Sequence, residues 1–461
     1  MFLFPLIYII SFLKTLKEFS KANASGLLIF IIVAMPIYIN VLSITHMYGL
    51  DGLIGILQFF KEFLVIIALF IVIIQFKKIP KFTTTDILVA IFLLYSFLFV
   101  LLPIGSYNII SKLLAFKSLS FFCILYFVGR FIQIKYIQLG KYFKLIGMMT
   151  LLAAVIVLME YLRNEHFHAN TGFTNLLINY FDGEQSGNYG LIWTFETQTG
   201  QKRFGSLFGS PLEMAASMVL TLSICLAYYT DYSKRLFLTK FGRICLICSL
   251  ICITLALSRA SFIGYLIVLC VYALITNNKK IIKLIYIALS FASVYLIYFL
   301  AQTDIYNFII DSVTFKNASS IGHVLEWIDG FEAMIQKPFG LGLGESGRIS
   351  MVSNDNIGGE NQFIITGIQV GFPMLIIYIW IHINLMKKAY KYLWSQSGKT
   401  KRIAFTIFLF KIGILLPMFT SNTEGFVYLS YFTWFLSGLL INITSRYETG
   451  RSAQISTKTI L

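Results

Sequence analysis

Long apolar runs separated by short basic segments are the main pattern in this sequence. A membrane-spanning helix needs about 20 apolar residues in a row, and twelve runs come close to that length. Their approximate bounds are 26–44, 57–76, 86–104, 112–132, 144–161, 211–229, 242–258, 261–277, 283–301, 364–386, 403–419 and 425–445. The pattern predicts an all-α polytopic membrane protein with about 12 transmembrane helices, folded as one integral membrane domain over residues 1–461.

One apolar stretch is too long to be a single span. From Ile244 to Thr276 the only charged residue is Arg259, in the sequence "LALSRASFIG". As one helix this stretch would extend about 50 Å, against about 30 Å of hydrocarbon in a bilayer. We therefore expect two short helices with a reversal of the chain near Arg259.

The distribution of charge orients the predicted helices. Hydrophobic residues make up 57% of the chain and charged residues 13%, as in a membrane protein. Of the 37 Lys and Arg residues, 26 fall in seven short segments on one side, with only four of the 21 acidic residues. Because basic segments stay in the cytoplasm, we expect both termini to be cytoplasmic. The first 21 residues lack the features of a signal peptide, so we expect an interfacial helix there.

The opposite side carries two long connecting segments, over about 162–211 and 301–361. The second contains "SIGHVLEWIDGFEAMIQ", whose apolar residues recur near helical spacing and which ends before Pro338. We expect a surface helix over about 321–336. Connections of this length usually carry function or are disordered, and their scattered aromatic residues argue against disorder.

Cations outside the basic segments are the first candidates for chemistry. A cation within a span costs a few kcal/mol on insertion scales, so it usually faces the bundle interior. Lys61 and Lys411 could instead snorkel or pair structurally, and Arg259 could pair with a buried carboxylate. Arg259 and the pair Lys202 and Arg203, in "QKRFGSLFGSP", are expected at the outer ends of neighbouring spans. Guanidinium groups match phosphate oxygens well, so we expect these cations to converge on one anion with an apolar tail.

Four sequence blocks follow one another in a characteristic order. They are "KRFGSLFGSPLEMAASMVLTLSICLA", "LALSRASFIGYLIVL", "WIDGFEAMIQKPFGLGLG" and "ENQFIITGIQVGFPMLIIYI". In this order, at this spacing and on this side of the membrane, they resemble the O-antigen ligase and polymerase superfamily. The resemblance covers about residues 203–377 and implies a GT-C-like arrangement of transmembrane helices in the bacterial plasma membrane.

The resemblance also implies a chemistry and an acceptor. Such enzymes transfer a glycan from undecaprenyl diphosphate, the lipid carrier of the substrate, at a site facing the periplasm or exterior, with no other cofactor and no metal ion. Arg203 and Arg259 would hold the diphosphate, because cations aimed at the developing charge lower the barrier. A carboxylate would accept the proton of the attacking hydroxyl.

The sequence departs from the ligase pattern at two positions. Glu360 stands where ligases carry a histidine, and a carboxylate there is common among repeat-unit polymerases. His323 stands at the usual position of an arginine, and a protonated imidazole could partly replace it. Glu360 would act as the base or bind the acceptor sugar, or else be a solvated carboxylate near a helix start. Other acids that could serve as the base are Glu326, Asp329, Glu345 and Asp355.

The remaining candidates would bind substrate. Lys202, His323 and Arg348 would be secondary contacts to the diphosphate, and Asn361 would position the acceptor. Trp327 would stack on a sugar, although Trp residues in such places often anchor a protein at the membrane interface.

The sequence analysis therefore predicts a polymerase of lipid-linked oligosaccharide repeat units. A ligase that moves finished glycan to lipid A core or to protein is the alternative within the family, and a flippase or exporter of lipid-linked sugars is the alternative outside it. The expected partners are lipid-linked oligosaccharides, membrane lipid, a chain-length regulator and a flippase. The net charge of +16 reflects sidedness and anionic lipid, so no nucleic-acid partner is expected.

Overall fold

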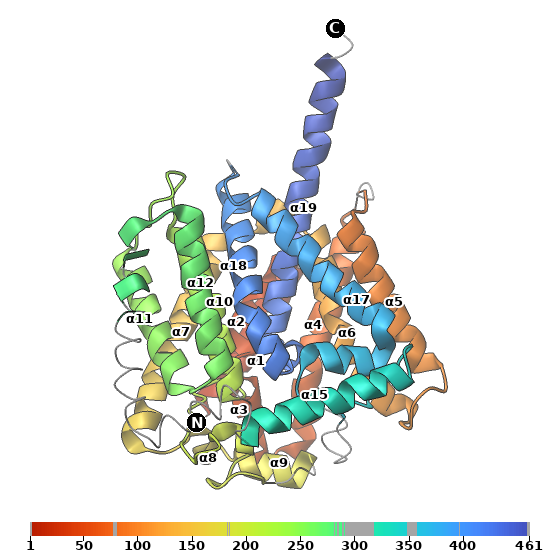
Figure 1. Cartoon of the computed structure of the whole chain (residues 1–461), viewed down its shortest axis with the longest axis vertical. Coiled ribbons are helices and arrows are strands. Elements are labelled where there is room, and N and C mark those ends of the chain that lie inside the picture. The colour runs from red at the N-terminus through yellow and green to blue at the C-terminus, as the bar shows by residue number, and fades with distance from the viewer. Residues whose placement is uncertain are drawn as a thin grey trace.

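Long helices account for most of the described chain (Figure 1). The structure is a computed structural model that describes all residues except 1, 77–80, 182, 184, 281, 284, 288–289, 291–317, 348–356, 396 and 459–461. The first half comprises α1 (Leu3–Phe19), η1 (Ala24–Gly26), α2 (Leu27–Ala34), α3 (Tyr38–Met47), η2 (Asp51–Leu53), α4 (Ile54–Ile74), α5 (Thr84–Leu101), α6 (Ile109–Phe131), η3 (Ile134–Tyr136), α7 (Leu139–Arg163), α8 (Phe167–Asn170), α9 (Phe173–Phe181) and η4 (Trp193–Phe195). The second half comprises α10 (Pro211–Tyr229), α11 (Lys240–Leu255), α12 (Arg259–Thr276), α15 (Ala318–Gln336), α17 (Gln362–Lys391), α18 (Gly398–Thr420), η5 (Thr423–Gly425) and α19 (Val427–Lys458).

The described residues contain nine helices that are long and apolar enough to cross a membrane. They are α4, α5, α6, α7, α10, α12, α17, α18 and α19. Residues 24–47 form a further apolar pair, α2 and α3, bent by 64° at residues 35–37. α11 occupies the predicted span at 242–258 with 16 residues, whereas the predicted span at 283–301 lies almost entirely outside the described residues. The all-helical, multi-pass architecture is confirmed, and the count of twelve stays a prediction.

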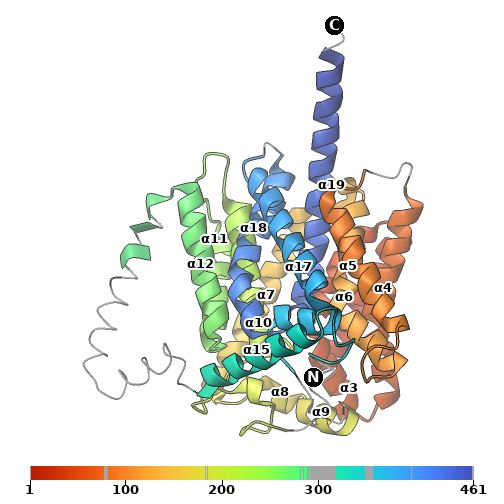
Figure 2. The same cartoon turned by 45° about the vertical axis from the view of Figure 1, so that its right-hand side comes forward.

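The N-terminal helix corrects one prediction. The ring of Phe2 stacks on Tyr48 at 4.3 Å, and Phe4 lies 5.5 Å from Phe167 in α8. At the other end of α1, the side chain of Gln75 donates a hydrogen bond to the carbonyl of Ala22. α1 therefore runs through the bundle and is not an interfacial helix, and the two termini lie at opposite ends of the bundle (Figures 1 and 2). The prediction that both termini lie on the same side is therefore wrong. The lysines of α1 lie near the C-terminal end of this helix.

The two ends of the bundle differ in character. The connections α10–α11 and α17–α18 and the C-terminus lie at one end, and α8, α9 and α15 lie at the other (Figures 1 and 2). At the first end the described basic segments are tied to their neighbours: Lys401 donates to the carbonyl of Thr230 at 2.8 Å, and Lys388 pairs with Glu448 at 2.8 Å. We call the end with α8, α9 and α15 the outer end, as the positive-inside rule indicates.

Glycines allow two helix pairs to touch through their backbones. A Cβ on Gly438 of α19 would lie 1.9 Å from the carbonyl oxygen of Tyr126 in α6. A Cβ on Gly264 of α12 would lie 2.1 Å from the carbonyl oxygen of Gly413 in α18. Small residues at such crossings are typical of packing in membranes. The second contact holds α12, and with it Arg259 at its first position, against the outer half of α18.

α17 is broken where the glycine-rich loop docks. Gly371 has φ +83° within the helix, and Pro373 follows. The break frees carbonyl groups, and the loop supplies their donors: the N–H of Leu341 bonds to the carbonyl of Ile368 at 2.7 Å. In turn, the N–H of Phe372 bonds to the carbonyl of Pro338 at 2.8 Å. The sequences "PFGLGLG" and "GIQVGFP" are thus two halves of one contact that fixes the first half of α17.

Candidate active site

Lys202 and Arg203 are neighbours on a short segment that pairs with residues 195 and 196, and their side chains point in different directions. Lys202 forms an isolated antiparallel bridge with Glu196, and the N–H of Arg203 bonds to the carbonyl of Phe195 at 2.8 Å. Successive side chains on an extended strand face opposite sides. Lys202 donates to the carbonyl of Asn164 at 2.6 Å, whereas Arg203 lines a cavity. Lys202, a predicted contact to the diphosphate, is therefore not part of the cavity lining.

Buried polar groups fix the turn that follows Arg203. Ser206 has φ +53°, and its N–H donates to the carboxylate of Glu160 in α7 at 2.8 Å. Asn40 of the bent helix pair donates to the carbonyl of Leu207 at 2.9 Å, and the ring of His168 bonds to the carbonyl of Phe208 at 2.7 Å. Three separate elements thus hold this turn in place.

Sequence reasoning missed these positioning groups. The rule applied to cations within spans applies equally to acids. Glu160, one residue before the end of the predicted span over 144–161, could have been found by it. Its partners could not, because they come from segments far apart in the sequence.

Arg259 is the first residue of α12, as the length argument predicted. The chain reverses through residues 256–258, where Leu257 has φ +47°. Ser258 is at the N-cap position of α12, and its hydroxyl donates to the hydroxyl of Ser261 at 3.2 Å. The N–H of Phe204 donates to the carbonyl of Leu255 at 3.3 Å, which joins the strand of Arg203 to the end of α11. This hydrogen bond brings the segments of the two arginines together.

Glu360 lies directly before the start of α17. The preceding Gly358 and Gly359 have φ +82° and +63°, and a Cβ on Gly359 would lie 2.0 Å from the Glu326 carboxylate in α15. Asn361 is the N-cap of α17: its side-chain oxygen accepts from the N–H groups of residues 363 and 364, at 2.9 and 3.3 Å. Asn361 is buried and its side chain caps the helix. It does not line the cavity described next, where its predicted contact with the acceptor would require it.

Four of the predicted site residues line one cavity at the outer end of the bundle. This cavity, which we call the larger cavity, has a volume of about 520 Å³. It is bounded by the first outer segment, α10, α12, α15, α18 and Glu360, which precedes the N-cap of α17. Among its lining residues are Arg203, Arg259, Trp327 and Glu360. The volume lies within the range of about 300–1,000 Å³ typical of small-molecule sites.

A smaller cavity adjoins the larger one at the arginines. It has a volume of about 410 Å³, and Arg203, Ser258 and Arg259 line both cavities. Thr197 and Gln198 also line both cavities. The rest of the smaller cavity combines polar residues with an apolar side formed by Ile253, Leu257 and Phe262. The two guanidinium groups thus lie where the two cavities adjoin, next to this apolar side.

The two arginines form a positive centre. Burial lowers the pKa of Arg203, the neighbouring Arg259 lowers it further, and Glu360 opposes both effects. Within the described part of the chain, no carboxylate lies at ion-pair distance from either arginine. The buried Nε of Arg203 also finds no hydrogen-bond acceptor there. Because two adjacent cations repel each other, an anion at this point would stabilise both.

The remaining predicted residues are placed elsewhere or lie outside the description. The side chain of His323, on α15, and all of Arg348 and Asp355 are outside the described residues. Glu345 accepts hydrogen bonds from the N–H and hydroxyl of Ser106 at 2.5 and 2.9 Å, so it holds the α5–α6 connection. Among the described residues no group of three His, Cys, Asp or Glu side chains could hold a metal ion.

The intramembrane lysines have structural partners. Lys61 donates to the hydroxyl of Tyr38 at 2.8 Å and lies 3.4 Å from Glu62. Lys411 lies 4.2 Å above the ring of Trp434. Neither lysine lines the two cavities, which favours the structural interpretation of both.

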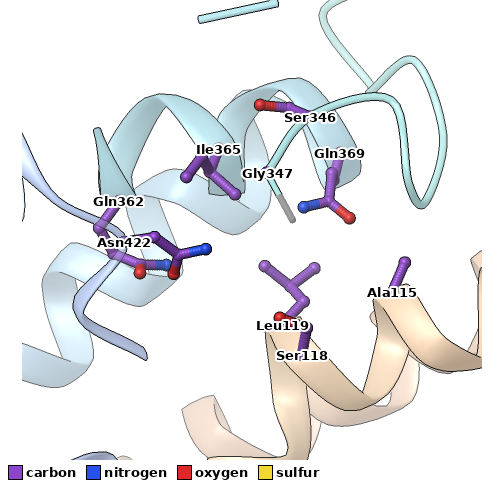
Figure 3. Close-up of a pocket in the computed structure, with 9 residues that line it drawn as sticks. All are labelled: Ala115, Ser118, Leu119, Ser346, Gly347, Gln362, Ile365, Gln369 and Asn422. Carbon is purple, nitrogen blue, oxygen red and sulfur yellow. The ribbon is translucent and has the colours of Figure 1, made fainter. Parts of the chain in front are cut away.

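A small polar cavity lies between the first half of α17 and α6. Figure 3 shows Gln362 next to Asn422, and Gln369 farther along α17, above Leu119 and Ala115 of α6. Gln362 accepts from the N–H of Glu424 at 3.0 Å, and Gln369 accepts from the N–H of Gly344 at 3.1 Å. Its volume of about 10 Å³ suits at most a single water molecule. These amides hold in position the helix start that follows Glu360.

Part of the chain matches a known protein family. Residues 244–379 match the family model described as O-antigen ligase. The resemblance to the O-antigen ligase and polymerase superfamily is confirmed. The matched segment includes Arg259, Trp327 and Glu360, and it ends in α17, whereas Arg203 lies before it. No curated protein matches the chain. The family match and the apolar helices together support a multi-pass membrane protein with a ligase-like or polymerase-like function.

Proposed function

We propose that this protein polymerises oligosaccharide repeat units carried on undecaprenyl diphosphate, at the outer face of a bacterial plasma membrane. The observation that carries the proposal is the cavity in which Arg203, Arg259 and Glu360 meet. Two guanidinium groups that have no carboxylate at ion-pair distance among the described residues lie beside the apolar side of the smaller cavity. This arrangement suits a ligand with an anionic head and a long apolar tail. The carboxylate of Glu360 in the larger cavity suits a base for a sugar hydroxyl.

The transfer is a direct displacement. The acceptor hydroxyl oxygen attacks the anomeric carbon of the donor sugar, and its proton passes to the Glu360 carboxylate. The bond between the anomeric carbon and the phosphate oxygen breaks, and its electron pair leaves with undecaprenyl diphosphate. Arg203 and Arg259 stabilise the negative charge that builds up on the diphosphate. A single displacement inverts the configuration at the anomeric carbon.

A ligase is the second candidate, because the matched family is described by that activity. Glu360 at the position of the ligase histidine favours the polymerase. The two functions differ only in the acceptor: another lipid-linked repeat unit, or lipid A core or protein. The site described above would serve either acceptor through the same arginines and base.

The experiment is a transfer assay with purified protein. Lipid-linked repeat units are supplied with no other acceptor, and the products are resolved by chain length. A polymerase gives a ladder of longer glycans, and Arg259→Ala, like Arg203→Ala, abolishes the ladder while the protein still inserts in the membrane. A ladder that forms only after addition of lipid A core or protein would replace the polymerase by the ligase. Long ladders from both arginine variants would overturn the site.

A further inference from the structure

The two cavities that meet at the arginines differ in what they can bind. Arg203, Ser258 and Arg259 line both, but Glu360 lines only the larger one. If Glu360 accepts the proton of the acceptor hydroxyl, that hydroxyl must lie in the larger cavity, because a base acts within hydrogen-bond reach. This step rests on the proposed function, whereas the lining of each cavity is independent of that function.

The larger cavity has the lining of a sugar-binding site. Trp193, from the first outer segment, and Trp327, from α15, both line it, and Trp193 is 48% exposed. A pyranose ring has one face of C–H groups and an edge of hydroxyl groups. An indole face covers the C–H groups, and the side-chain oxygen of Asn188 in the same cavity can accept a hydrogen bond from a hydroxyl group.

The part of this lining in the first outer segment is already held in place. Glu196 accepts hydrogen bonds from the N–H and the side-chain amide of Asn188, at 3.0 to 3.2 Å. Tyr189 donates to the carbonyl of Gly200 at 2.5 Å, and Lys202 lies 4.6 Å from the centre of its ring. A loop that is held in place before binding loses less conformational entropy when the ligand arrives.

One side of the smaller cavity suits the tail of a lipid. Ile253, Leu257 and Phe262 contribute apolar side chains there, whereas the residues from 197 to 201 form a polar side. Leu257 and Phe262 are 37% and 36% exposed, at the outer ends of α11 and α12. Exposed apolar side chains at this level continue the lipid-facing surface of those helices.

We propose that the larger cavity binds the acceptor sugar against Trp193, and that the smaller cavity binds the first isoprenoid units of the donor lipid. The shared arginines then hold the diphosphate between the two. Trp193 and Asn188 select the acceptor sugar, and Phe262 contacts the lipid.

Binding experiments without catalysis test this division. Methyl glycosides of common hexoses and N-acetylhexosamines are screened by saturation-transfer NMR, and farnesyl diphosphate is titrated while thermal unfolding is followed. We expect Trp193→Ala to weaken glycoside binding about tenfold and to leave the stabilisation by farnesyl diphosphate unchanged. We expect Phe262→Ser to do the reverse. Trp380→Ala is the matched control, because Trp380 is 50% exposed on α17 and does not line either cavity.

The outcomes separate this inference from the proposed function. Glycoside binding that survives Trp193→Ala, that is lost equally in Trp380→Ala, or that is absent from the wild-type protein would overturn the division. A wild-type protein that binds both probes in the expected cavities but transfers no sugar would sink the proposed function and leave the two binding sites standing.

Discussion

Replacing Arg203 by alanine separates a binding role from a structural role. Charge-assisted hydrogen bonds are worth about 1.5–3 kcal/mol each, and a guanidinium fork can make two to a diphosphate. Their loss at the transition state should raise the barrier by about 3–6 kcal/mol. Each 1.36 kcal/mol is a factor of ten, so we expect transfer to slow by about 10² to 10⁴.

The same substitution should not harm the free protein. Arg203 has no carboxylate at ion-pair distance among the described residues, and its buried Nε lacks an acceptor there. Its pKa is lowered by burial and by Arg259, so its charge is unfavourable in the absence of an anion. We expect the midpoint of thermal unfolding of Arg203→Ala to equal or exceed that of the wild type, and the stabilisation by farnesyl diphosphate to disappear.

The neighbouring lysine provides the control. Lys202 has the same charge and lies next to Arg203 in the sequence, but it points to the carbonyl of Asn164. We expect Lys202→Ala to change the transfer rate by less than about threefold, because surface interactions of this kind are weak. The reasoning fails if Lys202→Ala is as slow as Arg203→Ala. It also fails if Arg203→Ala unfolds at a clearly lower temperature and keeps its response to farnesyl diphosphate.

Three further predictions concern the base, a helix contact and pH. Glu360→Gln should lower the transfer rate by about 10² to 10⁴ with unchanged binding of farnesyl diphosphate; wild-type product yield would remove Glu360 from the catalytic set. Gly264→Ala should cost about 1–3 kcal/mol of stability and lower activity, because the new Cβ would lie 2.1 Å from the carbonyl oxygen of Gly413. Gly55→Ala should be tolerated, because no atom lies within 4 Å of a Cβ at that position. Equal unfolding temperatures of the two variants would contradict this prediction. Burial lowers the pKa of His168 to about 4 from its usual 6.5. As the pH falls, the unfolded chain therefore takes up the proton first. The stability that this histidine contributes is complete above pH 6.5 and should fall by about 3 kcal/mol as the pH drops to about 4. Unfolding temperatures measured across this range should fall less steeply for His168→Gln, and an unchanged slope would show that other groups are responsible.

Sequence patterns predicted the parts of the fold that depend on local quantities. The length of an apolar run and the sign of its flanking charges follow from transfer of residues into hydrocarbon, and each can be read from one segment. This is why the reversal at Arg259 was predicted correctly. The same reasoning failed for α1, whose 17 residues are shorter than a standard span and end among lysines. Only its contacts with Tyr48 and Phe167 show that it runs through the bundle.

The candidate site was also predicted only in part. The sequence by itself placed the arginines at the outer ends of neighbouring helices, because charged groups are costly in lipid and are kept where they have a use. Trp327 was predicted as an aromatic residue of an outer segment, and the resemblance to the ligase and polymerase superfamily singled out Glu360. The tertiary structure decided which of them share a cavity. Lys202 and Arg203 have the same charge and adjacent positions, and only the hydrogen bonds of one strand turn the first away from the cavity and the second into it. Such orientations depend on contacts between segments far apart in the sequence, and no property of a single segment contains them.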